Sequence, residues 1–159
     1  MQTEEYAREL ITAGVPWAKP GDVAAAVAER VNRAKNFAEA TSPLLWVVLD
    51  GMIVRRRFTT EDVRHEQLEH VIKLVESRRV SVQVIPENYR GHPGLTGPFK
   101  VITPDAGPDV VYAESIHEGQ IITSAADVSR YRLLFGRLQA VTLGPAESTE
   151  MIRKDLEHG

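Results

Sequence analysis

The sequence contains no cysteine. This absence excludes disulfide bonds, thiolate nucleophiles and zinc sites built from thiolates, and it is typical of proteins in a reducing cytoplasm. Long hydrophobic runs are missing too, since none approaches the roughly 20 residues that cross a bilayer. The segment MQTEEYAREL carries acidic residues where a signal peptide has a basic region. We therefore expect a cytoplasmic protein with no membrane partner.

Positive charge is not concentrated anywhere along the chain. The 19 Lys and Arg residues are mixed with 22 Asp and Glu residues, and the net charge is -3. A nucleic-acid surface usually needs a basic patch that releases counterions from phosphates. The tightest basic cluster, residues 55–57, is Arg-Arg-Arg, which we interpret as solvated surface. The composition predicts no direct nucleic-acid binding by this chain.

The length and the order of the expected elements predict one mixed α/β domain spanning residues 1–159. A chain of this size buries roughly 68–70% of its unfolded surface, so its core needs no metal or disulfide. Apolar residues at helical spacing and capping signals predict about five helices. The expected helix starts or caps are residue 4, Asp22, Thr59 or Thr60, Ser124 with Asp127, and Pro145.

Five strands are expected, and we predict that they form one mixed sheet. LLWVVLD (residues 44–50) and VSVQVIP (residues 80–86) are continuous apolar runs joined by a helix, which predicts a parallel βαβ unit covered on both faces. FKVIT, DVVYAES and GQIITS follow, separated by short turn-forming segments. Such spacing is typical of an antiparallel meander.

The connection IPENYRGHPGLTGPF (residues 85–99) is unusually long for a compact domain. Its prolines stiffen the chain and its glycines permit tight turns, which favours a shaped loop. It follows a parallel strand, where α/β sheets place ligand crevices. A loop that only connects remains the alternative. The candidate ligand-binding residues of the loop and the strands beyond it are Tyr89, Arg90, His92, Phe99, Tyr112 and Glu114.

Glu114 ends a predicted strand in which it shares a face with Tyr112. If that face is internal, the acid is buried or lines a cleft with a raised pKa, which suits proton transfer or amine recognition; otherwise it is solvated. With His117 and Glu118 it forms an apparent metal cluster, which we interpret as a solvated turn. His65 and His70 are five positions apart, a spacing that excludes a shared zinc ion. We expect no metal and no cofactor.

Several segments together resemble one family. They are QTEEYARELI, ERVNRAKNF, LLWVVLD, QLEHVIKLVESRRVSVQVIP, GHPGLTGPFKVI, VVYAES and RLQAVTLGPAESTEMIRK, and they cover nearly the whole chain. The series resembles the C-terminal, antitoxin-like regulatory domain of actinobacterial XRE-family helix-turn-helix transcriptional regulators. The resemblance implies a sensory or protein-interaction domain that regulates transcription and binds a small molecule or a small co-encoded protein.

Two features depart from that family's pattern. The family's DNA-binding domain is missing ahead of QTEEYA, so the chain is either a fragment or a free-standing version. Gly51 stands where the family commonly has an acidic residue. A free-standing version leaves open a small acid–base cyclase or isomerase of specialised metabolism, with Glu114, His92 or Asp50 as its catalytic residues. A homodimerisation module is the third alternative.

Overall fold

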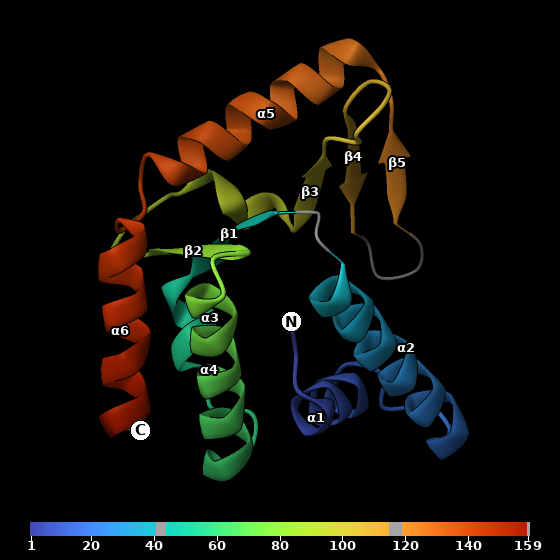
Figure 1. Ribbon diagram of the computed structural model, residues 1–159, viewed down its shortest axis with the longest axis vertical. Helices are drawn as coiled ribbons and strands as arrows, with labels where there is room; N and C mark the ends of the chain where they lie inside the picture. The colour runs from blue at the N-terminus through green and yellow to red at the C-terminus, as the bar shows by residue number, and fades with distance from the viewer. Residues whose placement is uncertain (41–43, 115–118, 159) are drawn as a thin grey trace.

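The computed structural model describes residues 1–40, 44–114 and 119–158, which form an α+β fold of helices and short strands (Figure 1). The helices are α1 (Glu4–Gly14), α2 (Pro20–Glu39), α3 (Gly51–Arg55), α4 (Glu61–Glu76), the 3-10 helix η1 (Pro93–Thr96), α5 (Ala125–Gln139) and α6 (Pro145–His158). The strands are β1 (Leu45–Asp50), β2 (Val80–Ile85), β3 (Phe99–Ile102), β4 (Val110–Ala113) and β5 (Gln120–Ile122).

The strands form two sheets instead of the single sheet expected. β1 and β2 are parallel, and β3, β4 and β5 form an antiparallel meander, so the predicted βαβ unit and meander are both confirmed. The edge of β2 that faces away from β1 bonds to α6 and to the segment just before it. The Val84 carbonyl accepts the Leu143 N–H at 2.9 Å, and the Val84 N–H donates to Ser148 Oγ at 2.9 Å.

The core surrounds β2, whose alternate residues Val80, Val82 and Val84 are almost completely buried. Helices α4 and α6 pack beside this strand, and α1 and α2 continue the helical layer (Figure 1). Burying such side chains contributes about 1.5–3 kcal/mol each, so β2 contributes substantially to the stability of the fold. The other members of the buried cluster are Val54, Leu68, Val71 and Ile152.

Strand β1 is less covered than its apolar sequence predicts. Leu45, Val47 and Leu49 pack against the core, but Trp46 on the other face is 59% exposed. The prediction of a strand covered on both faces is therefore wrong for β1. The reason is that a two-stranded sheet has few neighbours, and α4 and α6 cover only one of its sides.

The helix starts follow the predictions with local differences. α1, α4 and α6 start as expected, whereas α2 starts at Pro20, because proline fits the first helical position. Asp22 is therefore not its cap, and its carboxylate accepts the Lys19 N–H at 3.4 Å instead. Ser124 precedes α5 but makes no side-chain capping bond. The short helix α3 was not expected.

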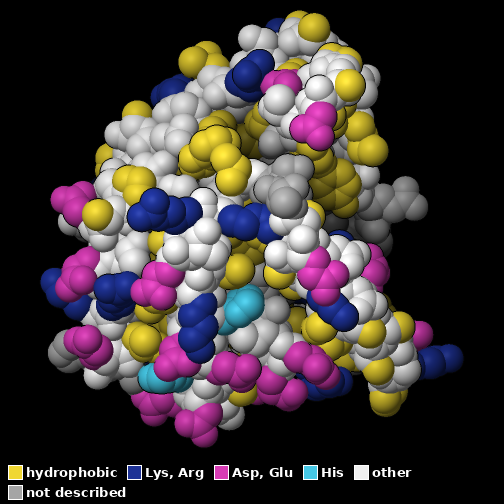
Figure 2. Space-filling model, in the orientation of Figure 1, with side chains coloured by type: hydrophobic (Ala, Val, Ile, Leu, Met, Phe, Trp, Pro, Cys, Tyr) yellow, Lys and Arg dark blue, Asp and Glu magenta, His cyan; other side chains and the backbone are white. Residues whose placement is uncertain are grey.

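The meander and α5 form an arm beside the helical layer (Figure 1). α5 contacts β3, β4 and η1, and its end is tied to β2, since Gln139 Nε2 donates to Gln83 Oε1 at 3.0 Å. Figure 2 shows basic and acidic side chains interspersed over one face, with acidic ones gathered along the lower edge. Among the described residues, no helix has the length and apolar character needed to cross a membrane.

Candidate functional site

A pocket of about 350 Å³ lies where η1, the start of β3 and the end of β4 meet α5. We call it the α5 pocket. Its lining residues are Thr96, Gly97, Pro98, Phe99, Ala113, Glu114, Arg130, Tyr131 and Leu134. The loop that the sequence singled out therefore does wall a concavity beside Glu114, through its last residues.

The pocket is built on the inner face of the meander. Phe99 and Ala113 are register partners on β3 and β4, and α5 lies over them. The rings of Phe99 and Tyr131 meet edge to face, with centroids 5.1 Å apart and an interplanar angle of 61°. Such a pair fixes both side chains and presents aromatic surface to a ligand.

Two charged residues, Glu114 and Arg130, lie at the edge of this largely apolar pocket, and both side chains are exposed. Glu114 is 44% exposed, and its carboxylate pairs with Lys100 Nζ at 2.7 Å. Arg130 is on α5, where its guanidinium pairs with Asp127 at 2.8 Å. Glu114 is thus a solvated acid at the edge of the pocket, because its carboxylate turns to Lys100 on the face of the meander that also carries Tyr112, and the alternative of a buried acid is wrong.

His92 and Asp50 are brought together, although the sequence separates them by a strand, two helices and a loop. His92 is buried, and its Nε2 lies 3.2 Å from Asp50 Oδ2, while its Nδ1 accepts the Gly94 N–H at 3.2 Å. Because Nδ1 is the acceptor, Nε2 carries the proton and donates it to Asp50. Both ring nitrogens are therefore occupied, which leaves His92 no free lone pair for acid–base work.

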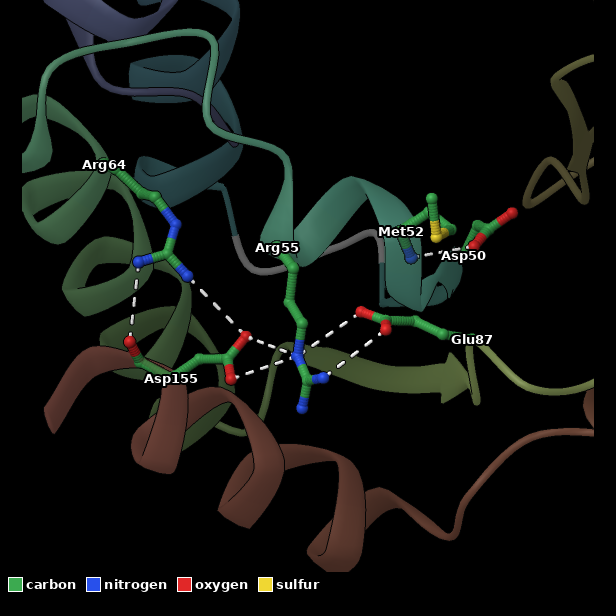
Figure 3. A network of polar contacts seen from close by, with 6 residues as sticks. All are labelled: Asp50, Met52, Arg55, Arg64, Glu87 and Asp155. Atoms are coloured by element: carbon green, nitrogen blue, oxygen red, sulfur yellow. Dashed lines mark hydrogen bonds and ion pairs between the residues drawn. The ribbon is translucent and has the colours of Figure 1, made fainter. Parts of the chain in front are cut away.

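Asp50 has a second structural role. Its Oδ1 accepts the Met52 N–H at 2.9 Å, which caps α3 (Figure 3). Gly51, the position that departs from the pattern of the resemblance described above, is buried beneath this turn. A Cβ at Gly51 would lie 2.8 Å from the Ile85 carbonyl oxygen, so an acidic side chain would require the backbone to move.

The remaining predicted ligand residues lie outside the α5 pocket. Tyr89 and Arg90 are exposed in the loop after β2 and do not line it. Tyr112 is on the outer face of the meander, where Lys100 Nζ lies 5.2 Å from its ring centroid. The predicted ligand set is therefore divided, with only Phe99 and Glu114 at the pocket. His117 and Glu118 lie outside the described residues.

Sequence reasoning missed the α5 side of the pocket, which consists of Arg130, Tyr131 and Leu134. Tyr131 belongs to the apolar stripe of α5, so its periodicity indicated burial but not a ligand pocket. Arg130 had no distinguishing signal, because a surface arginine in a helix is common. Only the packing of α5 on the meander brings these residues to the pocket.

A second polar cluster ties α3 and α4 to α6 (Figure 3). Arg55 Nε lies 3.2 Å from Asp155 and 3.3 Å from Glu87, and Arg64 Nη2 lies 3.6 Å from Asp155 Oδ2. Arg55, the first residue of the arginine run, is therefore held by two carboxylates. A hollow of about 360 Å³ beside it is lined by Arg55, Glu147, Glu150, Met151 and Lys154.

Within the described ranges, no three or more His, Asp or Glu residues lie close enough together to hold a metal ion. His65 pairs with Glu69 at 3.9 Å on the surface of α4, as its helical spacing predicts. His70 is half-buried, and burial lowers the pKa of its imidazole.

Comparisons with known proteins place the chain in a family. Neither the curated proteins nor the solved structures gave a match. A family match covers residues 1–154 of the 159 and carries the description "Domain of unknown function (DUF5753)". Because the match spans nearly the entire chain, the protein belongs to the DUF5753 family.

Proposed function

We propose that this chain is the sensory domain of a transcriptional regulator and that it binds a small molecule in the α5 pocket. The regulatory role comes from the resemblance to antitoxin-like domains of XRE-family regulators. In that setting the domain reads the concentration of a ligand and passes the information to a DNA-binding domain.

The observation that carries the proposal is the composition of the α5 pocket. Its volume of about 350 Å³ lies in the range of roughly 300–1,000 Å³ typical of small-molecule sites. Its surface is mostly apolar and aromatic, with the charged residues Glu114 and Arg130 at its edge. The two other sites considered support this role less well, because the Asp50–His92 pair and the Arg55 cluster hold structural elements together.

Helix α5 provides a route by which an occupied pocket would affect the core. Arg130, Tyr131 and Leu134 line the pocket. At the other end of α5, Gln139 bonds to Gln83 on β2. A ligand that changes the position of α5 would therefore act on β2 and α6 through one rigid element, provided that it binds the two arrangements with different affinity.

A metabolite screen by thermal shift and ligand-observed NMR tests the proposal with a matched pair of variants. Leu134→Trp fills the pocket, whereas Leu133→Trp adds the same ring at an adjacent position that is 68% exposed. A true ligand at 100 times its Kd adds about 2.7 kcal/mol of stability. We expect this stabilisation in the wild type and in Leu133→Trp but not in Leu134→Trp. Ligands that stabilise all three proteins equally would refute the pocket assignment.

A protein partner is the second candidate, and the exposure of both tryptophans favours it. Trp17, between α1 and α2, is 77% exposed, and Trp46 on β1 is 59% exposed. Tryptophan is enriched among the residues that dominate binding energies at interfaces. If a small co-encoded protein is the partner, Trp17→Ala or Trp46→Ala should weaken the complex in calorimetry while Leu134→Trp leaves it intact. Equal affinity for all variants would exclude both tryptophan surfaces.

A further inference from the structure

We infer that the free edge of β1 pairs with β1 of a second copy of this chain, in antiparallel orientation, so that the two β1–β2 sheets join into one. Such a dimer would form whether or not a ligand occupies the α5 pocket. The direction of the peptide groups of β1, its apolar side chains and the state of the other strand edges support this interface.

Alternate peptide groups of β1 point away from β2. The Leu45 N–H donates to the Arg79 carbonyl at 2.9 Å, so the peptide groups of Leu45 face β2 in the parallel register. Successive residues of a strand direct their N–H and C=O groups to opposite edges, and those of Trp46 and Val48 therefore face the other edge. Within the described ranges, these backbone groups of Trp46 and Val48 have no protein partner. They are donors and acceptors available to another strand.

The exposure of β1 agrees with an open edge. None of its residues is buried, whereas four of the six residues of β2 are. Trp46 is 59% exposed, and Leu44, just before the strand, is 57% exposed. A strand with neighbours on both edges and both faces would bury more of these side chains. β1 is therefore an edge strand that water reaches.

The other strand edges in the described part of the fold are protected, and this one is not. Native proteins protect edges by keeping them short, by placing lysine or proline on them, or by covering them. β5 has only three residues, β3 follows Pro98 and carries Lys100, and the edge of β2 away from β1 bonds to Leu143 and Ser148. Residues 45–49, LWVVL, include neither a charged residue nor proline. An unprotected apolar edge of this kind favours a partner strand that covers it.

A second copy of the chain matches this edge in hydrogen bonding and in side chains. In antiparallel pairing, the N–H and C=O groups of Trp46 bond to those of Val48 in the second copy, and the reverse pair forms at the same time. One two-fold axis relates the two halves, as in most homodimers. Each Trp46 ring then lies opposite a Val48 side chain, and an aromatic residue opposite a β-branched one is a stabilising cross-strand pair.

Charge favours the antiparallel orientation. Asp50 ends β1, whereas Arg79 lies beside the first residue of the strand, since its carbonyl accepts the Leu45 N–H. Antiparallel pairing brings the acidic end of one copy near the basic end of the other, and parallel pairing would bring like ends together. Residues 44–49 carry no charge. A charged peptide from another protein would therefore gain no ion pair along the strand itself.

Tryptophan fluorescence and sedimentation equilibrium test the dimer. The chain has two tryptophans, and Trp17→Phe leaves Trp46 as the only one. We expect the emission of Trp46 to move to shorter wavelength as the concentration of this variant rises from nanomolar to high micromolar, because pairing removes the ring from water. Sedimentation equilibrium over the same range should show a monomer that becomes a dimer, with the same midpoint.

Two variants separate the side chain from the backbone. Trp46→Lys places a charge on the edge, and Trp17→Lys makes the same change between α1 and α2, at a residue that is 77% exposed. Val48→Pro removes an N–H that faces away from β2, so the β1–β2 pair should remain intact, as for prolines on edge strands. We expect Trp46→Lys and Val48→Pro each to raise the Kd of the dimer by at least about tenfold, and Trp17→Lys to leave it unchanged.

A chain that stays monomeric at high micromolar concentration would overturn the inference. A dimer that Trp17→Lys weakens as much as Trp46→Lys does, or that folded Val48→Pro leaves unchanged, would overturn it too. Circular dichroism and melting curves show whether each variant folds; if Val48→Pro does not, the comparison of Trp46→Lys with Trp17→Lys decides. Ligand binding in the α5 pocket is measured separately through Leu134→Trp, so failure of the dimer leaves the sensory proposal standing.

Discussion

The imidazole of His92 donates a hydrogen bond from Nε2 to Asp50 Oδ2 at 3.2 Å. The bond joins the end of β1 to the start of η1, across 42 residues of sequence. Asp50 also caps α3, and His92 also accepts the Gly94 N–H. The pair therefore holds the end of β1, the start of α3 and the start of η1 in place. These contacts explain why two residues that suit a catalytic dyad serve as a structural connection.

We predict that Asp50→Ala and His92→Ala each destabilise the protein by about 2 kcal/mol, because each removes a part-buried hydrogen bond and a local cap. Urea denaturation of the two single variants and the double variant measures their coupling. The double variant should lose about 1 kcal/mol less than the sum of the single losses, since the shared bond is lost only once. Strictly additive losses would mean that this bond contributes nothing to stability.

Ser148 is predicted to be among the most sensitive polar residues of the fold. It is completely buried, and its hydroxyl accepts the Val84 N–H at 2.9 Å and lies 3.3 Å from the Leu143 carbonyl oxygen, to which it donates. Ser148→Ala leaves both backbone groups without that partner, which should cost about 1–3 kcal/mol. The adjacent Thr149→Ala removes a hydroxyl that bonds only within α6, to Pro145, and should cost about 0.5 kcal/mol or less. Equal shifts of the denaturation midpoint would contradict the role given to Ser148.

Asp155 should matter more than the chain's surface acids. The side chain of Arg64 is 10% exposed and that of Asp155 is 14% exposed, so Asp155→Ala leaves a buried guanidinium without its carboxylate (Figure 3). We expect the free energy of unfolding to fall by about 2 kcal/mol, below the usual cost of breaking a fully buried pair because the separation is 3.6 Å. Glu29→Ala, which breaks an exposed pair with Arg33 on α2, is the control and should have little effect. Chemical denaturation gives both values.

The stability of the protein should decrease as the pH falls below about 6.5, and His70 should contribute to this decrease. Burial lowers the pKa of His70 from its usual 6.5, with a further lowering from nearby positive charge that includes Lys73 and an opposing effect from Glu66. Above about pH 6.5 the His70 ring is neutral in both the folded and the unfolded protein, and its contribution to the free energy of unfolding is at its full value. Below it, the unfolded chain takes up the proton first, so stability is lost until the pH passes the folded pKa.

Melting curves between pH 8 and pH 5 test this prediction. His70→Gln should reduce the loss of stability at low pH, because the unfolded state no longer gains a proton at this position. His65→Gln changes an exposed histidine of the same helix and should keep the wild-type slope. A slope that is identical for the wild type and His70→Gln would show that His70 does not cause the acid sensitivity.

The sequence was sufficient for the longer helices, for the strands, and for which neighbouring strands pair. Continuous apolar runs joined by a helix predicted the parallel β1–β2 pair, and turn-separated strands predicted the meander. Helical periodicity and the proline of α6 predicted where several helices start. These features depend on residues close together in sequence, whose conformational preferences are local.

The candidate site was only half predictable, because its two walls are distant in sequence. Phe99 and Glu114 were candidates from the loop and the strand beside it, but Arg130, Tyr131 and Leu134 reach the pocket only when α5 packs on the meander. Glu114 could be placed on a strand face, yet its exposure depended on which side of the sheet α5 covers.

The sequence by itself determined the longer helices α1, α2, α4, α5 and α6, the strands, and the absence of thiol chemistry. Only the tertiary structure decided that the strands form two sheets, that His92 bonds to Asp50, and that a pocket opens beside Glu114. The physical reason is that backbone preference and periodicity act over a few residues, whereas pockets, buried hydrogen bonds and occupied sheet edges arise from the packing of segments that are far apart along the chain.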